Sequence, residues 1–208
     1  MVHDRIVHVI DDDEAARESL EFLLRSAGIE VSTYESAMQF LQALPQVKAG
    51  CVVTDVRMPG IDGLELLRRL RSAGVRVPVI VITGHGEISM AVEAMKIGAT
   101  DFLEKPFDDD ILLAAVRNAL SAQERSEHED AARAVLLERL ASLSVRERQV
   151  LEGLVAGSPN KVIAHDLGIS PRTVEIYRAN VMSKMQADSL SQLVRMALSA
   201  GIIGEQAD

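Results

Sequence analysis

Carboxylates, a hydroxyl and an ammonium group follow the apolar runs of the first half of the chain, and together they could carry out phosphoryl chemistry. They are Asp11, Asp12 and Asp13 after the first run, Asp55 at the end of the third, Thr83 after the fourth and Lys105 after the fifth. Carboxylates crowded at one place repel one another and need a cation. Oxygen ligands of this kind suit Mg²⁺, and an aspartate beside that ion can attack phosphorus to give an aspartyl phosphate. We therefore expect a phosphoacceptor site that uses Mg²⁺.

The other polar groups have roles that fit this chemistry. Lys105 would neutralise a phosphoryl oxygen as a point charge, and Thr83 would donate a hydrogen bond to another. The small residue Gly84 would leave space for a phosphodonor and for water. A second interpretation is that the acidic run simply begins a helix, where negative charge is favoured. We expect that simpler role, as the helix N-cap, for Asp13 alone.

Strand and helix signals alternate through the first 120 residues. β-branched runs predict strands, and apolar residues at helical spacing, most of them ending at a glycine or proline, predict helices. The predicted strands cover 5–10, 30–34, 50–54, 77–82 and 100–104, and the predicted helices cover 14–27, 36–44, 64–73, 88–97 and 109–125. Five such units predict an α/β fold: a doubly wound, five-stranded parallel sheet of the flavodoxin-like kind. In such sheets ligands gather beyond the carboxyl ends of the strands, where the polar residues named above lie.

The last third of the chain has no strand signals and is predicted to form a second unit. Residues 123–139 are rich in Ala, Glu and Arg, which predicts a helical linker that continues the preceding helix. Four helices are predicted after it, near 144–156, 160–167, 171–186 and 189–200. We therefore divide the chain into a first domain at 1–122, the linker at 123–139 and an all-α, four-helix domain at 140–208.

Composition indicates a cytoplasmic protein whose two domains differ in charge. The chain has 208 residues, 48% of them hydrophobic and 25% charged, which is typical of globular proteins. Its single cysteine, Cys51, is expected to be a buried apolar residue. No apolar run approaches the roughly 20 residues that cross a bilayer, and the N-terminus does not resemble a signal peptide. Residues 139–208 carry eight Lys/Arg and seven Asp/Glu, a balance of +1, whereas residues 1–138 carry 14 Lys/Arg and 24 Asp/Glu, a balance of −10. The net charge of −9 therefore comes from the first two thirds of the chain.

Four motifs of the first domain resemble, in order and spacing, the receiver domain of two-component response regulators. They are VIDDD at 9–13, VTDVRMPG at 53–60, ITG at 82–84 and FLEKP at 102–106. The resemblance covers about residues 1–122 and implies that Asp55 is the phosphoacceptor. It implies a Mg²⁺ site built from Asp11, Asp12, Asp55 and the backbone carbonyl of Arg57. It also implies that Lys105 pairs with the phosphoryl group and that the Lys105–Pro106 peptide bond is cis.

The same resemblance implies a switch that carries the signal to a dimer surface. Thr83 and Phe102 match the family's switch pair, in which the hydroxyl moves toward the phosphoryl group and the aromatic ring turns inward. The alternative for Phe102 is a plain core residue. Phosphorylation adds about two negative charges, and we expect the surface at 88–104 to respond by pairing with its two-fold mate in a homodimer. The residues assigned to that surface are Met90, Ala91, Ala94 and Met95.

The second domain contains a predicted helix-turn-helix. Ser144 and Glu147 have the spacing of a capping box, and Ser170 begins a later helix after Gly168. Two helices joined by a tight turn place the second in the major groove of double-stranded DNA. Its core-facing side is assigned to Val174, Tyr177, Val181 and Met185. The candidate DNA-binding residues are Lys161 of the preceding helix and Arg172, Thr173, Glu175, Ile176, Arg178, Ala179, Asn180 and Lys184.

These candidates have different expected contacts. Arg178, Asn180 and Lys184 suit base edges or phosphates, and the apolar members suit a thymine methyl group. Glu175 can accept a hydrogen bond from cytosine but repels phosphate. The alternative is an ordinary solvated helix face.

Residues 140–202 resemble the LuxR-type DNA-binding domain. The motifs that carry this resemblance are LSVRERQVL at 143–151, NKVIA at 160–164, LGIS at 167–170 and RTVE at 172–175. The family often has Lys where Glu175 stands, so the base preference is open. Together the two domains resemble the FixJ/NarL class of response regulators. The segments RMP at 57–59, ITGHGE at 82–87 and SPNK at 158–161 favour the FixJ side of that class.

That resemblance implies a transcriptional activator rather than an enzyme. A sensor histidine kinase, a haem-based oxygen sensor in FixJ systems, would phosphorylate the chain. The homodimer would then bind promoter DNA and, with RNA polymerase, activate nitrogen-fixation and microaerobic genes. One alternative is a Mg²⁺-dependent aspartyl-phosphate phosphotransferase or phosphatase, which the attached helical domain and the lack of a substrate cap disfavour. Another is an interaction module whose last helices bind protein instead of DNA.

Overall fold

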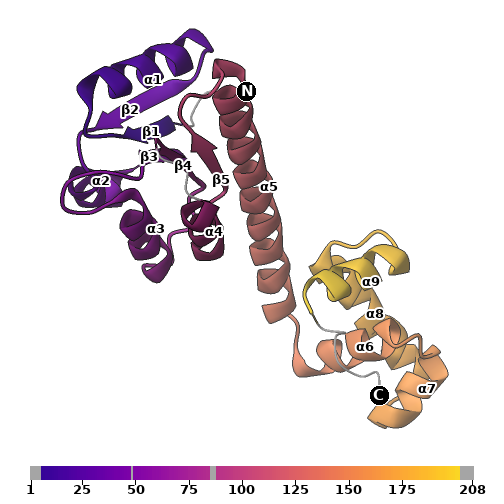
Figure 1. Cartoon of the computed structure of the whole chain (residues 1–208). Helices are drawn as coiled ribbons and strands as arrows, with labels where there is room; N and C mark the ends of the chain where they lie inside the picture. The colour runs from indigo at the N-terminus through magenta and orange to yellow at the C-terminus, as the bar shows by residue number, and fades with distance from the viewer. Residues whose placement is uncertain (1–5, 48, 85–87, 202–208) are drawn as a thin grey trace. The chain divides into compact units, whose positions relative to one another are not determined.

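The computed structural model describes residues 6–47, 49–84 and 88–201, which form two compact units (Figure 1). The division falls between Ser126 and Glu127. Helix α5 (Asp109–Ala141) contributes residues to both units. The predicted first residue of the opening strand (Arg5), the second half of the ITGHGE motif (85–87) and the last residues of the chain (202–208) lie outside the described residues.

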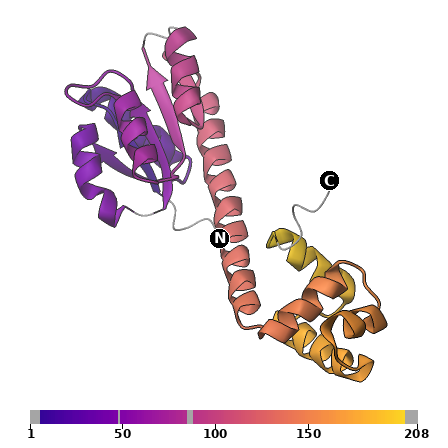
Figure 2. The ribbon, with the colours of Figure 1, turned by 90° about the horizontal axis from the view of Figure 1, so that it is seen from below.

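Within the described residues the first unit is a five-stranded parallel sheet with helices on both faces (Figure 2). The strands are β1 (Ile6–Ile10), β2 (Glu30–Tyr34), β3 (Gly50–Asp55), β4 (Val79–Thr83) and β5 (Asp101–Glu104), in the spatial order β2-β1-β3-β4-β5. They alternate with α1 (Glu14–Ser26), α2 (Ala37–Ala43) and its 3₁₀ turn (Leu44–Gln46), α3 (Gly63–Ser72), α4 (Ile88–Ile97) and α5. The predicted doubly wound, flavodoxin-like sheet is confirmed.

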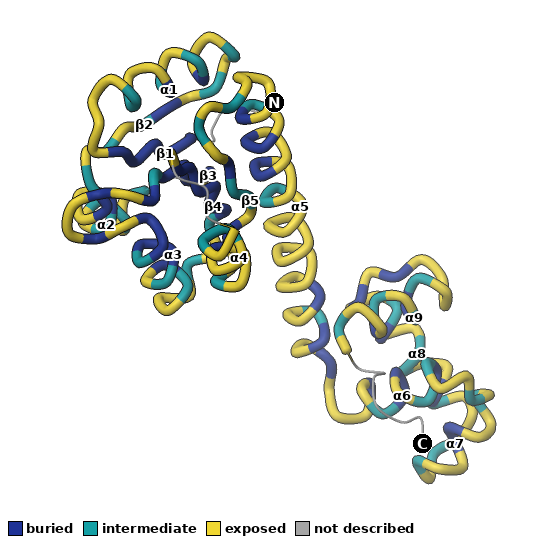
Figure 3. The backbone as a smooth tube through the Cα atoms, viewed as in Figure 1, coloured by how far each residue is buried: buried dark blue, intermediate teal, exposed yellow. Residues whose placement is uncertain are grey.

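Helices cover both faces of the sheet and create two apolar cores. Successive side chains of a strand point to opposite faces. Val7 and Val9 pack with α1 and α5, whereas Ile10 packs with α2 and α3. Strands β1, β3 and β4 are therefore buried along almost their whole length (Figure 3), which explains their unbroken apolar runs. Cys51 is fully buried in the first core, as expected, and this burial raises the pKa of its thiol to about 12.

The described residues of the second unit form helices joined by short turns. Its helices are α6 (Val145–Val155), α7 (Asn160–Leu167), α8 (Pro171–Met185) and α9 (Leu190–Ser199). Val174, Val181 and Met185 of α8 are fully buried and Tyr177 packs beside them, as the helical spacing predicts. The segment assigned to a linker is helical, as expected. Its later turns nevertheless pack as part of this unit, because Leu136 and Leu140 of α5 lie in the same core.

Helix ends follow the capping signals in the sequence. Asp13 is the N-cap of α1, and its side chain accepts hydrogen bonds from the backbone N–H groups of the first turn. The capping box of Ser144 and Glu147 is formed at the start of α6. Gly168 ends α7 with a φ of 65°, a conformation that glycine adopts without steric cost. Within the described ranges, no helix combines the length and apolarity needed to cross a membrane.

Candidate functional site

The polar residues expected at one edge of the sheet are brought together at its topological switch point. The chain continues from β1 to β2 on one side and later places β3 on the other side of β1. Ligands of open α/β sheets bind beyond the carboxyl ends of the strands at such a point. Asp11 directly follows β1, Asp55 is the last residue of β3, and Lys105 follows β5. The fold thus converts three distant sequence positions into one polar cluster.

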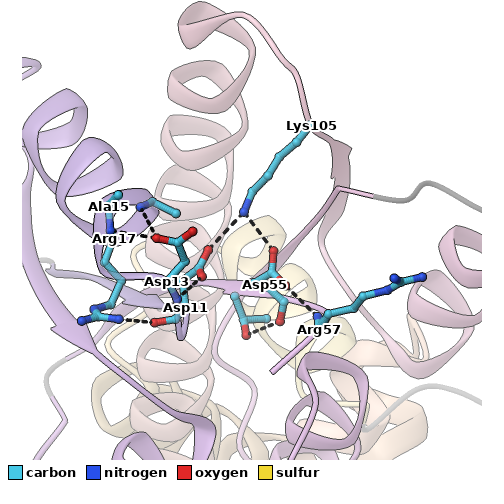
Figure 4. A network of polar contacts seen from close by, with 9 residues as sticks. Asp11, Asp13, Ala15, Arg17, Asp55, Arg57 and Lys105 are labelled. Carbon is cyan, nitrogen blue, oxygen red and sulfur yellow. Dashed lines mark hydrogen bonds and ion pairs between the residues drawn. The ribbon is translucent and has the colours of Figure 1, made fainter. Parts of the chain in front are cut away.

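Lys105 connects the two carboxylates. Its Nζ atom lies 2.9 Å from Oδ1 of Asp55 and 3.1 Å from Oδ2 of Asp11, as Figure 4 shows. Only 4% of the Asp11 side chain and 12% of the Asp55 side chain are exposed. Burial alone would lower the pKa of Lys105, but the hydrogen bonds and charges of Asp55 and Asp11 outweigh it and raise the pKa. The lysine is therefore an ammonium ion at neutral pH.

The second oxygen of each carboxylate is held by the backbone. The N–H of Asp13 donates to Oδ1 of Asp11 over 3.0 Å, and the N–H of Arg57 donates to Oδ2 of Asp55 over 2.6 Å. The guanidinium of Arg17 donates to the carbonyl oxygen of Asp11. These bonds fix both carboxylates, so that each directs its other oxygen toward Lys105 (Figure 4). A carboxylate that is already held in place can react with an incoming group without reorganisation of the site.

A backbone hydrogen bond holds the chain at Lys105 against the end of β4. The N–H of Lys105 donates to the carbonyl oxygen of Thr83 over 2.7 Å, and the expected cis bond between Lys105 and Pro106 is confirmed. Thr83 is fully buried at the end of β4. Phe102 pairs with Val81, so Phe102 and Thr83 lie on the same face of neighbouring strands. Phe102 is partly buried and packs against the second core.

The expected magnesium ligands are only partly assembled. Asp11 and Asp55 both contact Lys105, whereas Asp12 is exposed. Among the residues that the structure describes, no three carboxylate, histidine or cysteine side chains are grouped as a metal site. The Lys105 ammonium lies between the two buried carboxylates where a cation would be needed. The donor chemistry itself fits Mg²⁺, because the cluster offers carboxylate oxygens with one ammonium shared between two of them.

Two residues of this cluster were not singled out from the sequence. Arg17 holds the backbone of Asp11, and Gly63 donates its N–H to the carbonyl oxygen of Val56, next to Asp55. An arginine in an amphipathic helix and a glycine at a loop end are both common. No signal in a single sequence separates these two from their neighbours.

One of the α4 residues that we expect at the dimer surface is buried instead. Ala94 is fully buried in the core between α4 and the sheet, so it cannot belong to an interface. Met90 is also partly packed against that core, whereas Met95 is half exposed. The exposed apolar residues of α4 are Ile88, Val92 and Met95. Because α4 is apolar on its outer side as well, its spacing alone did not distinguish the two sides.

Helix α8 presents most of the candidate DNA-binding residues to solvent. The exposed ones are Arg172, Glu175, Ile176, Ala179 and Asn180, with Lys161 exposed on α7, whereas Thr173 and Arg178 are half-buried. Lys184 is exposed as well, with 41% of its side chain accessible, but its ammonium lies 2.6 Å from a carboxylate oxygen of Glu147 and donates to the carbonyl oxygen of Ser142. This side chain is engaged with its own unit.

The family of the chain follows from comparison with known proteins. Residues 7–117 match the response regulator receiver domain, and residues 141–197 match the bacterial regulatory proteins of the luxR family. The chain therefore belongs to the two-component response regulators that combine a receiver with a LuxR-type DNA-binding domain.

Among these regulators the chain is of the FixJ type. It is 61% identical to the transcriptional regulatory protein FixJ of Azorhizobium caulinodans, over 94% of this chain and 93% of that protein. It is 55% identical to FixJ of Bradyrhizobium diazoefficiens, over 96% of this chain and 97% of that protein. A solved structure of the response regulator StyR has a TM-score of 0.84 at 41% identity, covering 94% of this chain and 98% of that one. A crystal structure of full-length FixJ from B. japonicum has a TM-score of 0.61 at 55% identity, covering 96% of this chain and 98% of that one. The curated FixJ relatives are named as transcriptional regulators, and the chain is accordingly a phosphorylated regulator of transcription rather than an enzyme.

Proposed function

We propose that Asp55 is the phosphoacceptor and that its phosphorylation gates dimerisation and promoter binding. The observation that carries this proposal is the Lys105 ammonium, shared by Asp55 and Asp11 at the switch point of the sheet. Asp55 is the less buried of the two carboxylates, so a phosphodonor reaches it more readily than it reaches Asp11.

The chemistry is a phosphoryl transfer to a carboxylate. An oxygen of Asp55 forms a bond to phosphorus while the bond between phosphorus and the leaving group of the donor breaks. Lys105 then neutralises an oxygen of the transferred group, and the hydroxyl of Thr83 donates to another. The backbone N–H of Arg57 continues to orient the carboxylate during transfer.

Magnesium fits this site as a resident ion. Asp11, Asp12, Asp55 and the backbone carbonyl of Arg57 would hold it, and its charge would offset the repulsion between the carboxylates and the phosphoryl oxygens. Lys105 alone cannot balance both Asp11 and Asp55, and the excess of negative charge at the cluster supports this assignment.

The signal passes from the site to α4. Thr83 and Phe102 share one face of adjacent strands, which suits a coupled movement of the hydroxyl and the ring. Met95, with Ile88 and Val92, gives α4 an exposed apolar stripe, and a homodimer through that stripe buries it. Two copies of α8 then face the two halves of a two-fold promoter site.

The biological role follows from the names of the relatives. FixJ proteins are called transcriptional regulatory proteins, and we infer that this chain activates nitrogen-fixation and microaerobic genes together with RNA polymerase. Its phosphodonor would be a cytoplasmic domain of a sensor histidine kinase that detects oxygen through haem, and the regulator would act in the cytoplasm.

DNA footprinting with and without acetyl phosphate tests this function. Sequence-specific protection that appears or strengthens with acetyl phosphate supports the proposal. Absence of specific protection in both states would refute DNA binding and favour a protein partner for the last helices.

A further inference from the structure

The first turn of α6 contains a buried acidic group that needs a cation. Glu147 is 4% exposed, and its Oε2 atom accepts the backbone N–H of Ser144 over 2.8 Å. The hydrogen bond from Lys184 contributes most to holding the pKa of Glu147 below its ordinary value, and the bond from Ser144 adds to it. Glu147 is therefore an ionised carboxylate inside the second unit, beside the start of α6.

Lys184, in the last turn of α8, supplies that cation. Its Nζ atom lies 2.6 Å from Oε2 of Glu147 and 3.2 Å from the carbonyl oxygen of Ser142. Turning Lys184 toward DNA would leave Glu147 buried without its counter-charge, which is strongly unfavourable. The lysine therefore joins the end of α8 to the segment between α5 and α6.

Arg139, in the last turn of α5, makes a second connection to the same end of α8. It donates to the carbonyl oxygen of Met185 over 3.1 Å and to the side-chain oxygen of Gln186 over 2.6 Å. Met185 is the last residue of α8, so its carbonyl has no partner within the helix, and a cation there is favoured by the helix dipole. Gln186 ends the helix in the left-handed conformation, with a φ of 52°.

We propose that Arg139 and Lys184 are positioning residues that fasten the C-terminal end of α8 to the junction of α5 and α6, so that the last turns of α5 set the orientation of α8 on DNA. This inference rests on the proposed function. It assigns Lys184 a role other than DNA contact, and it gives Arg139 a role that no sequence motif indicated.

Because α8 is long, a small tilt at its C-terminal end displaces the residues at its N-terminal end. Arg172 lies twelve residues before Lys184, which is about 18 Å along a helix that rises 1.5 Å per residue. A tilt of about 10° at the fastened end would therefore move the reading residues by about 3 Å. Hydrogen bonds to base edges do not tolerate such a shift. Specific binding should fall while attraction to phosphates persists.

The test compares single variants of the full-length chain on DNA. The probe is a duplex selected from a random pool with the wild-type chain treated with acetyl phosphate, against a scrambled duplex of equal length. Arg139→Ala is expected to lower affinity for the selected duplex about tenfold and to leave scrambled binding within about twofold. The slope of log affinity against log salt should stay unchanged, because no phosphate contact is lost. Arg133→Ala, which removes the same charge from an exposed site on the same helix, is the matched control and should bind as wild type.

Two further variants separate positioning from folding. Arg139→Lys keeps a donor near Met185 and should recover part of the specific affinity. The double variant Glu147→Gln/Lys184→Met leaves no unpaired buried charge, so it should fold, yet it should lose specificity as Arg139→Ala does.

The outcomes distinguish this inference from the function on which it rests. Wild-type affinity in Arg139→Ala and in the double variant would overturn the inference, as would a salt slope reduced by about one, which marks a direct phosphate contact. Equal losses on both duplexes, with a lower melting temperature, would indicate a structural role only and would overturn it as well. Failure of the wild-type chain to select any duplex would instead overturn the proposed function.

Discussion

Gly63, the first residue of α3, lies against the backbone of Asp55. A Cβ atom at this position would come within 2.2 Å of the carbonyl oxygen of Asp55 and within 3.2 Å of Cα of Val56. The absence of a side chain is what allows the start of α3 to pack beneath the end of β3. The position of Asp55 relative to Asp11 and Lys105 thus depends on a residue that does no chemistry itself.

Replacing this glycine should therefore damage both stability and phosphorylation. Gly63→Ala must push α3 away from β3, and we expect a loss of about 1–3 kcal/mol in the free energy of unfolding. Urea denaturation measures this loss. Gly84→Ala is the stability control, because nothing lies within 4 Å of the added Cβ there. Equal unfolding midpoints for the two variants would contradict the close approach of Gly63 to Asp55.

Removing the ammonium should make the site depend on a divalent ion for stability. In Lys105→Met the carboxylates of Asp11 and Asp55 face each other without a cation, which should cost about 1–3 kcal/mol at pH 7. Mg²⁺ should raise the melting temperature of this variant more than that of the wild-type chain. Lys96→Met, at an exposed position of α4, should respond as wild type. A variant that gains no more from Mg²⁺ than the wild type does would argue against a cation site between these carboxylates.

The ion pair of Glu147 should make the second unit sensitive to acid. The pKa of Glu147 is lower in the folded chain than its ordinary value of 4.5, chiefly because Lys184 donates to it. The stabilisation is therefore present above pH 4.5 and is lost as the pH falls through the folded pKa. The melting temperature of the second unit, followed by its NMR signals, should fall less between pH 5 and pH 3 in Glu147→Gln than in the wild-type chain. Identical pH profiles would show that the ion pair contributes nothing.

The exposed stripe of α4 should carry the phosphorylation-dependent dimer. Val92 is 47% exposed on this helix, and a carboxylate in its place would be buried unpaired in the interface. We expect Val92→Asp to remain monomeric after acetyl phosphate treatment, as measured by sedimentation. Phe22→Asp is the control, because Phe22 is 77% exposed on α1, which covers the opposite face of the sheet. A phosphorylated Val92→Asp chain that dimerises as wild type would place the interface elsewhere.

The meeting of Asp11, Asp55 and Lys105 could be predicted from the sequence because it follows from the topology of the sheet. Parallel strands end at one edge of a sheet, so Asp11, Asp55 and Lys105 must converge whatever the details of packing. Capping signals are similarly local, and Asp13 behaves as its position indicates.

Pairings between distant helices were not predictable in the same way. Lys184 and Glu147 are 37 residues apart, and Lys184 looks like any other cation on an exposed helix face until α6 is placed beside it. Ala94 was assigned to the wrong side of α4 because alanine fits a core and a surface equally well. Arg139 gave no signal, since its partner is a backbone carbonyl made available only by the end of α8.

The most direct measurement of the central claim is the site of covalent phosphorylation. The wild-type chain treated with acetyl phosphate and Mg²⁺ should gain one acid-labile phosphoryl group, and reductive trapping with peptide mass spectrometry should locate it at Asp55. Asp55→Asn should carry no such group. Undiminished label in that variant, or trapping at another residue, would contradict the account.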